Sequence, residues 1–419
     1  MKFNKWTLGL AALGVVSLAS AARADEKMSA LQTALSNTTI SGDVSASFNW
    51  AISPGGAAQI GSPSAFIPFQ GQYKQDGFNL DVVHLAISKP QDESPWASGY
   101  QVDLLFGPDA IGYNVAKPTS SSGGYYDGYS DFAIKQAYVV LRTPIGNGID
   151  WKVGVFDSPL GYEVFDAGND PNYTRSIGYA IEPTELTGIL GTYKINDQWS
   201  VSAGVANTLS AGINTRDNSS GFGDGAGSDW KKTIIGSLTY TAPSSWGWAA
   251  GSSIYAGGIY GYNGMAYGSY AADYQGNYYA GATINTPWKQ LTAGFAFDYA
   301  DHFTGEPIGV WVLGGYATYK ATDKLSINGR AEYAKASIYP AYEGYPRGNN
   351  NSPDLMELTG TIEYDMWANV VSRIELRWDH VLDNANEVAE GAYDISEYDY
   401  DTQFNRDSVG LYANIIYKF

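Results

Sequence analysis

Apolar and polar side chains alternate with a period of two along this chain, in segments of about ten residues. The clearest segment is 40–50, where Ile40, Val44 and Phe48 share one face while serine, aspartate and asparagine occupy the other. Successive side chains of a strand point to opposite faces, so this period predicts a strand with one apolar and one wet face. The chain must therefore fold into an architecture built from many such strands.

The alternation predicts about sixteen strands. They lie at 40–50, 78–88, 99–107, 135–142, 149–156, 185–195, 199–206, 233–240, 248–260, 277–284, 291–299, 309–319, 325–333, 355–364, 371–380 and 409–419. Val82 and Val83 break the alternation of the second strand, which predicts a β-bulge there.

The connections between these strands alternate between short and long. The long ones, rich in glycine, serine, asparagine, aspartate and tyrosine, fall at 51–77, 108–134, 157–184, 207–232, 261–276, 300–308, 334–354 and 381–408. Short turns at one rim and long loops at the other are typical of an up-and-down outer-membrane barrel. We predict an all-β, transmembrane, antiparallel β-barrel of about sixteen strands over 38–419, with both ends at the periplasmic rim.

The N-terminus predicts export. Lys2 and Lys5 precede an apolar run over 6–18, and a small-residue cleavage site at 22–24 completes a secretory signal peptide over 1–24. No apolar run of 18 residues follows, so a membrane crossing by the mature chain would require a closed barrel. Residues 25–37 have weak helical periodicity and are predicted to form an N-terminal periplasmic segment.

Composition supports this fold and excludes several functions. Charged residues make up 16% of the chain, against about 25% in ordinary soluble domains, and 49 glycines accompany 33 tyrosines and 12 tryptophans. The net charge of −18 argues against a nucleic-acid partner. The lack of cysteine excludes disulfides, thiolate zinc sites and cysteine catalysis.

The last strand carries an assembly signal and a family resemblance. Tyr417 and the terminal Phe419 follow alternating apolar residues, as in the signal read by the outer-membrane barrel-assembly machinery. Together with 78–90, 99–107 and the glycine-containing block 154–188, the chain resembles the OmpL-like β-barrel porins of Gram-negative-type bacteria. That resemblance implies an outer-membrane channel without catalytic residues, and it suggests a homotrimer.

A sixteen-stranded barrel keeps an aqueous channel, because side chains do not fill its interior. Six charged residues on polar strand faces are predicted to line it: Arg330, Glu332, Arg373, Glu375, Arg377 and Asp379. Two interpretations stay open. The charges could pair across strands and only stiffen the wall, or the arginines could face an acidic loop and create a field across the pore.

The candidate for that loop is 157–184, the third long connection, which contains Glu163, Asp166, Asp170, Arg175 and Glu182. If it folds inward, its carboxylates would meet entering ions at the narrowest point and favour cations. If it does not, it is a solvated external loop. We expect a weakly cation-selective porin for small hydrophilic solutes and ions, in contact with outer-membrane lipid.

Other functions have weaker support. Three histidines, His84, His302 and His380, lie on separate elements without a nucleophile-elbow or metalloprotease motif, so we expect no enzyme. Tyrosine-rich loops leave open a sugar-selective porin or a surface-binding adhesin barrel. We expect no cofactor and no metal site.

Overall fold

A computed structural model of the chain describes residues 38–53, 74, 76–111, 113, 117–118, 125–126, 130–209, 212–214, 232–262, 274–303, 308–338, 354–382 and 407–419. The predicted signal peptide and the segment 25–37 lie outside these residues. Within the described ranges, no helix is long and apolar enough to cross a membrane.

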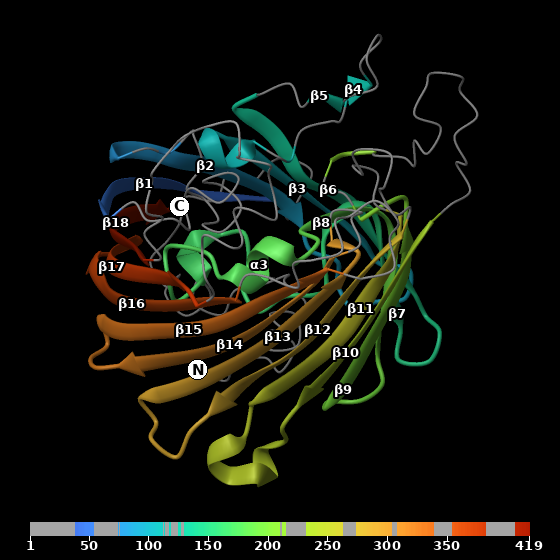
Figure 1. Ribbon diagram of the computed structural model, residues 1–419. Helices are drawn as coiled ribbons and strands as arrows, with labels where there is room; N and C mark the ends of the chain where they lie inside the picture. Colours follow the sequence, from blue (N-terminus) through green and yellow to red (C-terminus); the bar gives the residue numbers. More distant parts are fainter. Residues whose placement is uncertain are drawn as a thin grey trace.

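Sixteen strands close into one antiparallel barrel in which β1 pairs with β18, so the predicted fold class is confirmed (Figure 1). They are β1 (Thr39–Ser53), β2 (Gly77–Lys89), β3 (Ser98–Phe106), β6 (Phe132–Thr143), β7 (Ile149–Asp157), β8 (Glu185–Lys194), β9 (Trp199–Ala206), β10 (Thr233–Thr241), β11 (Ser253–Tyr262), β12 (Tyr274–Asn285), β13 (Leu291–Asp301), β14 (Ile308–Lys320), β15 (Leu325–Ile338), β16 (Asp354–Trp367), β17 (Val370–Val381) and β18 (Asp407–Lys418). Each pairs with its neighbours in the chain, except that β3 pairs with β6, because β4 (Lys117–Pro118) and β5 (Tyr125–Tyr126) form a separate sheet.

The predicted alternation places side chains as expected, and β17 shows this most clearly. Arg373 and Glu375 have exposed fractions of 3% and 0%, whereas the intervening Ile374 and the following Leu376 are 60% and 51% exposed. Polar side chains therefore point into the barrel and apolar ones point outward. An apolar outer surface of this kind suits contact with lipid.

Two local features differ from regular strands. The bulge predicted at Val82 and Val83 is present, but its extra residue is Asp81. Val82 pairs with Ser45 and Leu80 with Ala46, so Asp81 has no partner position on β1. The strand predicted from residue 248 was wrong at its start. Residues 244–249 form the 3-10 helix η4 (Ser244–Ala249), and Gly251 turns the chain with a φ of +81° before β11 begins at Ser253.

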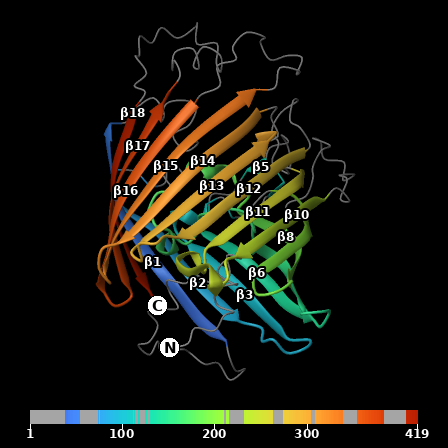
Figure 2. The ribbon, with the colours of Figure 1, turned by 90° about the horizontal axis from the view of Figure 1, so that it is seen from below.

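The two rims differ as predicted. Short turns join β2 to β3, β6 to β7 and the later strand pairs, and the C-terminus lies at this same end of the inclined strands (Figure 2). Among the longer connections, the one between β7 and β8 is described in full. It contains the 3-10 helix η3 (Ala167–Asn169) and the short helix α3 (Ile177–Ile181). A further 3-10 helix, η2 (Pro108–Ala110), follows β3.

Candidate functional site

The connection between β7 and β8, residues 158–184, lies inside the barrel, and we call it the inner loop (Figure 1). Its two helical turns begin at good N-cap residues. Asp166 accepts a hydrogen bond from the amide of Gly168 (3.0 Å), and Ser176 accepts one from the amide of Tyr179 (2.9 Å). From its origin at β7, the loop reaches far enough for α3 to contact β13, β14 and β15.

The six predicted pore-lining residues all lie beneath the inner loop. With two partners on β16 they form what we call the wall ladder: Arg330 and Glu332 on β15, Glu357 and Glu363 on β16, and Arg373, Glu375, Arg377 and Asp379 on β17. The exposed fractions of the six predicted residues are only 0–3%. The inner loop, rather than open solvent, covers them.

Part of the wall ladder consists of ion pairs within the wall. Guanidinium nitrogens approach carboxylate oxygens at 3.1 Å in Arg330–Glu357, 2.8 Å in Arg373–Glu363 and 2.8 Å in Arg377–Asp379. Buried charges require such partners, because the desolvation of an unpaired charge is costly. The wall therefore contains the pairing that one sequence interpretation anticipated, and it contacts the loop as well.

The wall ladder contacts the main chain of the inner loop. The arginines donate to carbonyl oxygens: Arg330 to Thr174 (2.6 Å), Arg373 to Ala167 (2.5 Å) and Asp170 (2.6 Å), and Arg377 to Arg175 (2.6 Å). The glutamates accept from amides: Glu375 from Tyr173 (2.6 Å) and Thr174 (2.9 Å), and Glu332 from Ile177 (2.7 Å) and Gly178 (3.1 Å). These charge-assisted bonds are stronger than neutral ones.

Three of the five candidate constriction residues are buried inside the loop. Glu163 accepts from Arg330 (2.9 Å), and Arg175 pairs with Asp170 (2.9 Å). The exposed fractions of Glu163, Asp170 and Arg175 are 5%, 5% and 1%. Burial raises the pKa of Asp170 to about 7, although the Arg175 guanidinium opposes the shift.

The other two candidates lie in different parts of the inner loop, Asp166 at the start of η3 and Glu182 just after α3. Asp166 lines a pocket between the loop and the wall. Glu182 follows α3, and its carboxyl hydrogen-bonds to the carboxyl of Asp298 on β13. Burial, together with the nearby Asp298 and Glu163, raises the pKa of Glu182 well above its ordinary value.

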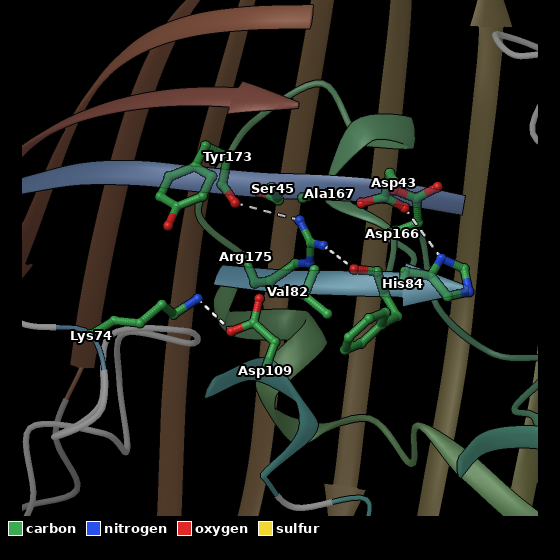
Figure 3. Close-up of a pocket in the computed structure, with 11 residues that line it drawn as sticks. Asp43, Ser45, Lys74, Val82, His84, Asp109, Asp166, Ala167, Tyr173 and Arg175 are labelled. Atoms are coloured by element: carbon green, nitrogen blue, oxygen red, sulfur yellow. Dashed lines mark hydrogen bonds and ion pairs between the residues drawn. The ribbon is translucent and has the colours of Figure 1, made fainter. Parts of the chain in front are cut away.

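The pocket is a small cavity between the inner loop, η2, β1 and β2 (Figure 3). Its lining residues are Asp43, Ser45, Lys74, Val82, His84, Asp109, Phe165, Asp166, Ala167, Tyr173 and Arg175. Lys74 pairs with Asp109 (2.5 Å) and His84 with Asp43 (3.2 Å). Burial raises the pKa of Asp109 to about 6, and Lys74 opposes this.

Only some residues of this pocket could be predicted from the sequence. Asp43 and His84 occupy polar faces of predicted strands, so their inward direction could be read from the alternation. Asp81, the bulge residue, accepts from Ser45, Ser47 and Tyr173 at 2.7–2.9 Å. Lys74 and Asp109 lie beyond strand ends, where no periodic pattern could assign them to the pocket.

The other side of the inner loop packs on an apolar part of the wall. Leu160 belongs to a buried cluster with Phe156, Leu186, Leu190, Ile235, Ile259, Tyr279 and Tyr316. Tyr162 stacks on Tyr316 with ring centroids 4.1 Å apart. Polar contacts to β15–β18 and apolar contacts to strands from β7 to β14 together fix the loop from both sides.

The remaining predicted residues lie apart from the inner loop. Phe419 exchanges backbone hydrogen bonds with Gly42 (3.0 and 2.9 Å), and Tyr417 is 50% exposed. Each histidine approaches an aspartate: His84 as above, His302 near Asp301, and His380 near Asp407. Among the described residues, no group of three or more histidine, aspartate or glutamate side chains could hold a metal ion.

The tyrosine-rich segments that left open a sugar-selective porin contain Tyr125, Tyr126, Tyr260, Tyr262, Tyr267, Tyr270 and Tyr274, which lie in different environments. Tyr260 is 48% exposed and stacks on Tyr274, whereas Tyr262 is buried at 2%. Tyr125 and Tyr126 form β5. Tyr267 and Tyr270 lie outside the described residues.

The sequence over residues 37–419 matches the family model described as "Putative beta-barrel porin-2, OmpL-like". The chain belongs to this porin family. It is an outer-membrane porin, and the match covers every barrel strand. At the level of sequence alone, no curated protein matches it.

Solved structures support the family assignment at the level of the fold. OmpF of Salmonella typhi, in complex with daunomycin, is 11% identical with a TM-score of 0.56, covering 91% of this chain and 97% of that one. An anion-selective porin from Comamonas acidovorans is 11% identical with a TM-score of 0.52, covering 91% and 99%. The trimer form of OmpT from Vibrio cholerae is 10% identical with a TM-score of 0.54, covering 91% and 99%.

Proposed function

We propose that this porin forms a water-filled channel for the passive diffusion of small hydrophilic solutes and ions, narrowed by the inner loop and weakly selective for cations. The observation that carries the proposal is the inner loop itself, which lies within the barrel and is bonded to its wall. A loop held there limits the size of the solutes that pass. The channel catalyses no reaction.

The proposed cation preference depends on which charged groups of the lumen remain unneutralised by a partner. The three wall arginines are bonded to carboxylates and to loop carbonyls, so they offer little field to a passing anion. In the pocket, Asp43 and Asp109 pair with His84 and Lys74, whereas the Asp166 carboxylate accepts hydrogen bonds from Gly168 and Asn169 and keeps its charge beside the pocket. Carboxylates at a narrow point favour cations.

The reversal potential across a bilayer under a KCl gradient tests this preference. We expect a potential of the sign set by cations, and a smaller one for Asp166→Asn. A clear anion preference of the native channel would refute the proposal. The anion-selective porin of similar fold shows why the measurement is needed, because a shared barrel does not determine the sign.

We also propose the surroundings of the channel. Residues 1–24 direct export and are removed, 25–37 stay in the periplasm, and Tyr417 with Phe419 is read by the barrel-assembly machinery. The apolar outer surface contacts outer-membrane lipid, and the trimer form of the Vibrio cholerae protein supports a homotrimer. Chemical cross-linking of the purified protein would show three linked species if this is correct.

A further inference from the structure

The wall of this barrel recognises the inner loop by its main chain. Besides the wall ladder, three further wall side chains donate to loop carbonyl oxygens: Asn277 to Ile181 (2.7 Å), Asn328 to Pro171 (2.7 Å) and Lys418 to Gly168 (2.7 Å). Every one of these bonds would form with any residue that places the same backbone atom there. These backbone bonds are therefore independent of the loop's side chains, and they add to the side-chain contacts made by Leu160, Tyr162 and Glu163.

Two glutamates account for the amide half of this recognition. We propose that Glu332 and Glu375 are positioning residues, each of which clamps two consecutive loop amides and so holds the inner loop in the lumen. That the clamped loop narrows a channel rests on the proposed function. The hydrogen bonds of the clamp belong to the folded chain, so they can be tested without measuring ion conduction.

Glu332 completes the N-terminus of α3. The first amides of a helix have no partner within the helix and need an acceptor from elsewhere. Ser176 supplies one for Tyr179, and Glu332 supplies the acceptors for Ile177 (2.7 Å) and Gly178 (3.1 Å). A carboxylate is also favoured at this end by the helix dipole. A strand of the wall thus caps a helix of the loop.

Glu375 is a fully buried carboxylate with each oxygen bonded twice. Oε2 accepts from the Tyr173 amide (2.6 Å) and the Thr361 hydroxyl (2.7 Å). Oε1 accepts from the amide (2.9 Å) and the hydroxyl (2.5 Å) of Thr174. A carboxylate offers about four lone-pair positions, so all of them are occupied. An amide side chain in this place could not accept all four bonds.

The clamp gives the wall ladder and Asp166 different tasks: the wall ladder holds the inner loop, and Asp166 acts on ions. All wall-ladder residues except Glu363 are covered at 0–3% exposure, and five of them bond to backbone atoms of the inner loop. Asp166, on the pocket side of the loop, is left to meet solutes. Changing Glu332 or Glu375 should therefore alter how firmly the loop is docked, and changing Asp166 should alter which ions pass.

Hydrogen exchange of the refolded full-length protein tests the clamp. In the native protein we expect slow exchange of the amides of 173, 174, 177 and 178. Because a bond to a charged group is among the stronger ones in proteins, Glu375→Gln should speed exchange at 173–174 by about tenfold or more, and Glu332→Gln should do the same at 177–178. The matched control is Glu93→Gln, since Glu93 is an exposed glutamate in the turn between β2 and β3, and exchange at these amides should stay unchanged.

The outcomes separate the clamp from the channel. Unchanged exchange in the Glu332→Gln/Glu375→Gln double variant, with a folded barrel shown by a heat-modifiable gel shift, would overturn the proposal. If the variants do not fold, the exchange rates of the native protein test the clamp. Unprotected exchange at these four amides would overturn the proposal, and slow exchange would support it. Native channels that fail to conduct would refute the proposed function and leave the exchange result intact.

Discussion

At the scale of single residues, Glu182 near the end of the inner loop meets the buried Asp298 of β13. Glu182 hydrogen-bonds to Asp298, and two carboxyl groups can share such a bond only if one of them carries a proton. Glu163 and Glu332 lie near enough to oppose a second charge. The proton shared by Glu182 and Asp298 is thus part of the attachment between the loop and β13.

This attachment predicts sensitivity to alkaline pH. Because the folded-state pKa of Glu182 is raised, its contribution to loop docking is complete below the ordinary value of 4.5 and is lost as the pH rises through the raised pKa. We expect single-channel current noise to increase at high pH in the native protein and much less in Glu182→Gln, which keeps a hydrogen-bond donor without titrating. Equal alkaline noise in both proteins would contradict the assignment.

Gly161 predicts a second residue-scale effect. Its φ of +113° is unfavourable for other residues, and an added Cβ would collide with the carboxylate of Glu182. Gly161→Ala should therefore cost about 1–3 kcal/mol of the free energy of unfolding. Gly236→Ala is the control, because nothing lies within 4 Å of an added Cβ there. Urea unfolding should show a lower midpoint for the first variant only.

At the scale of elements, the sequence predicted the strands far better than the loop. Lipid outside and polar groups inside impose period two on every strand, which is why β17 could be located with its charged face inward. The start of β11 was missed because Trp248 continues the alternation into η4. The inner loop's contacts could not be predicted from the sequence, because the backbone amides of Tyr173 and Ile177 would be present with almost any residue type at those positions.

The outward face of β17 provides an element-scale prediction. Leu376 is 51% exposed between inward-facing Glu375 and Arg377. Arginine on the lipid face near the midplane costs about 2–4 kcal/mol, so Leu376→Arg should reduce the folded fraction in lipid vesicles. Leu376→Ala, which removes size without adding charge, should fold nearly as well as the native chain. The heat-modifiable gel shift measures both, and equal folding of the two variants would mean that this face does not contact lipid.

At the scale of the whole molecule, the barrel closes where its two ends meet. β18 pairs with β1 from Asp43–Lys418 to Ser53–Val409, and the backbone of Phe419 adds two bonds to Gly42. Closure matters because an open sheet edge would leave unpaired backbone groups in the membrane. The last strand therefore serves the fold by its backbone, while its terminal aromatic side chain remains available for recognition.

Phe419→Ala separates these two roles. The variant keeps the backbone bonds to Gly42, so we expect it to refold into detergent or lipid as well as the native protein. In cells, loss of the ring should reduce the amount assembled in the outer membrane severalfold, because we propose that the barrel-assembly machinery reads this side chain. Trp367→Ala is the matched control, since Trp367 is a 65% exposed aromatic at the end of β16, beside the short turn to β17. Equal assembly of the two variants in cells, or failure of Phe419→Ala to refold in vitro, would show that Phe419 acts through the fold instead.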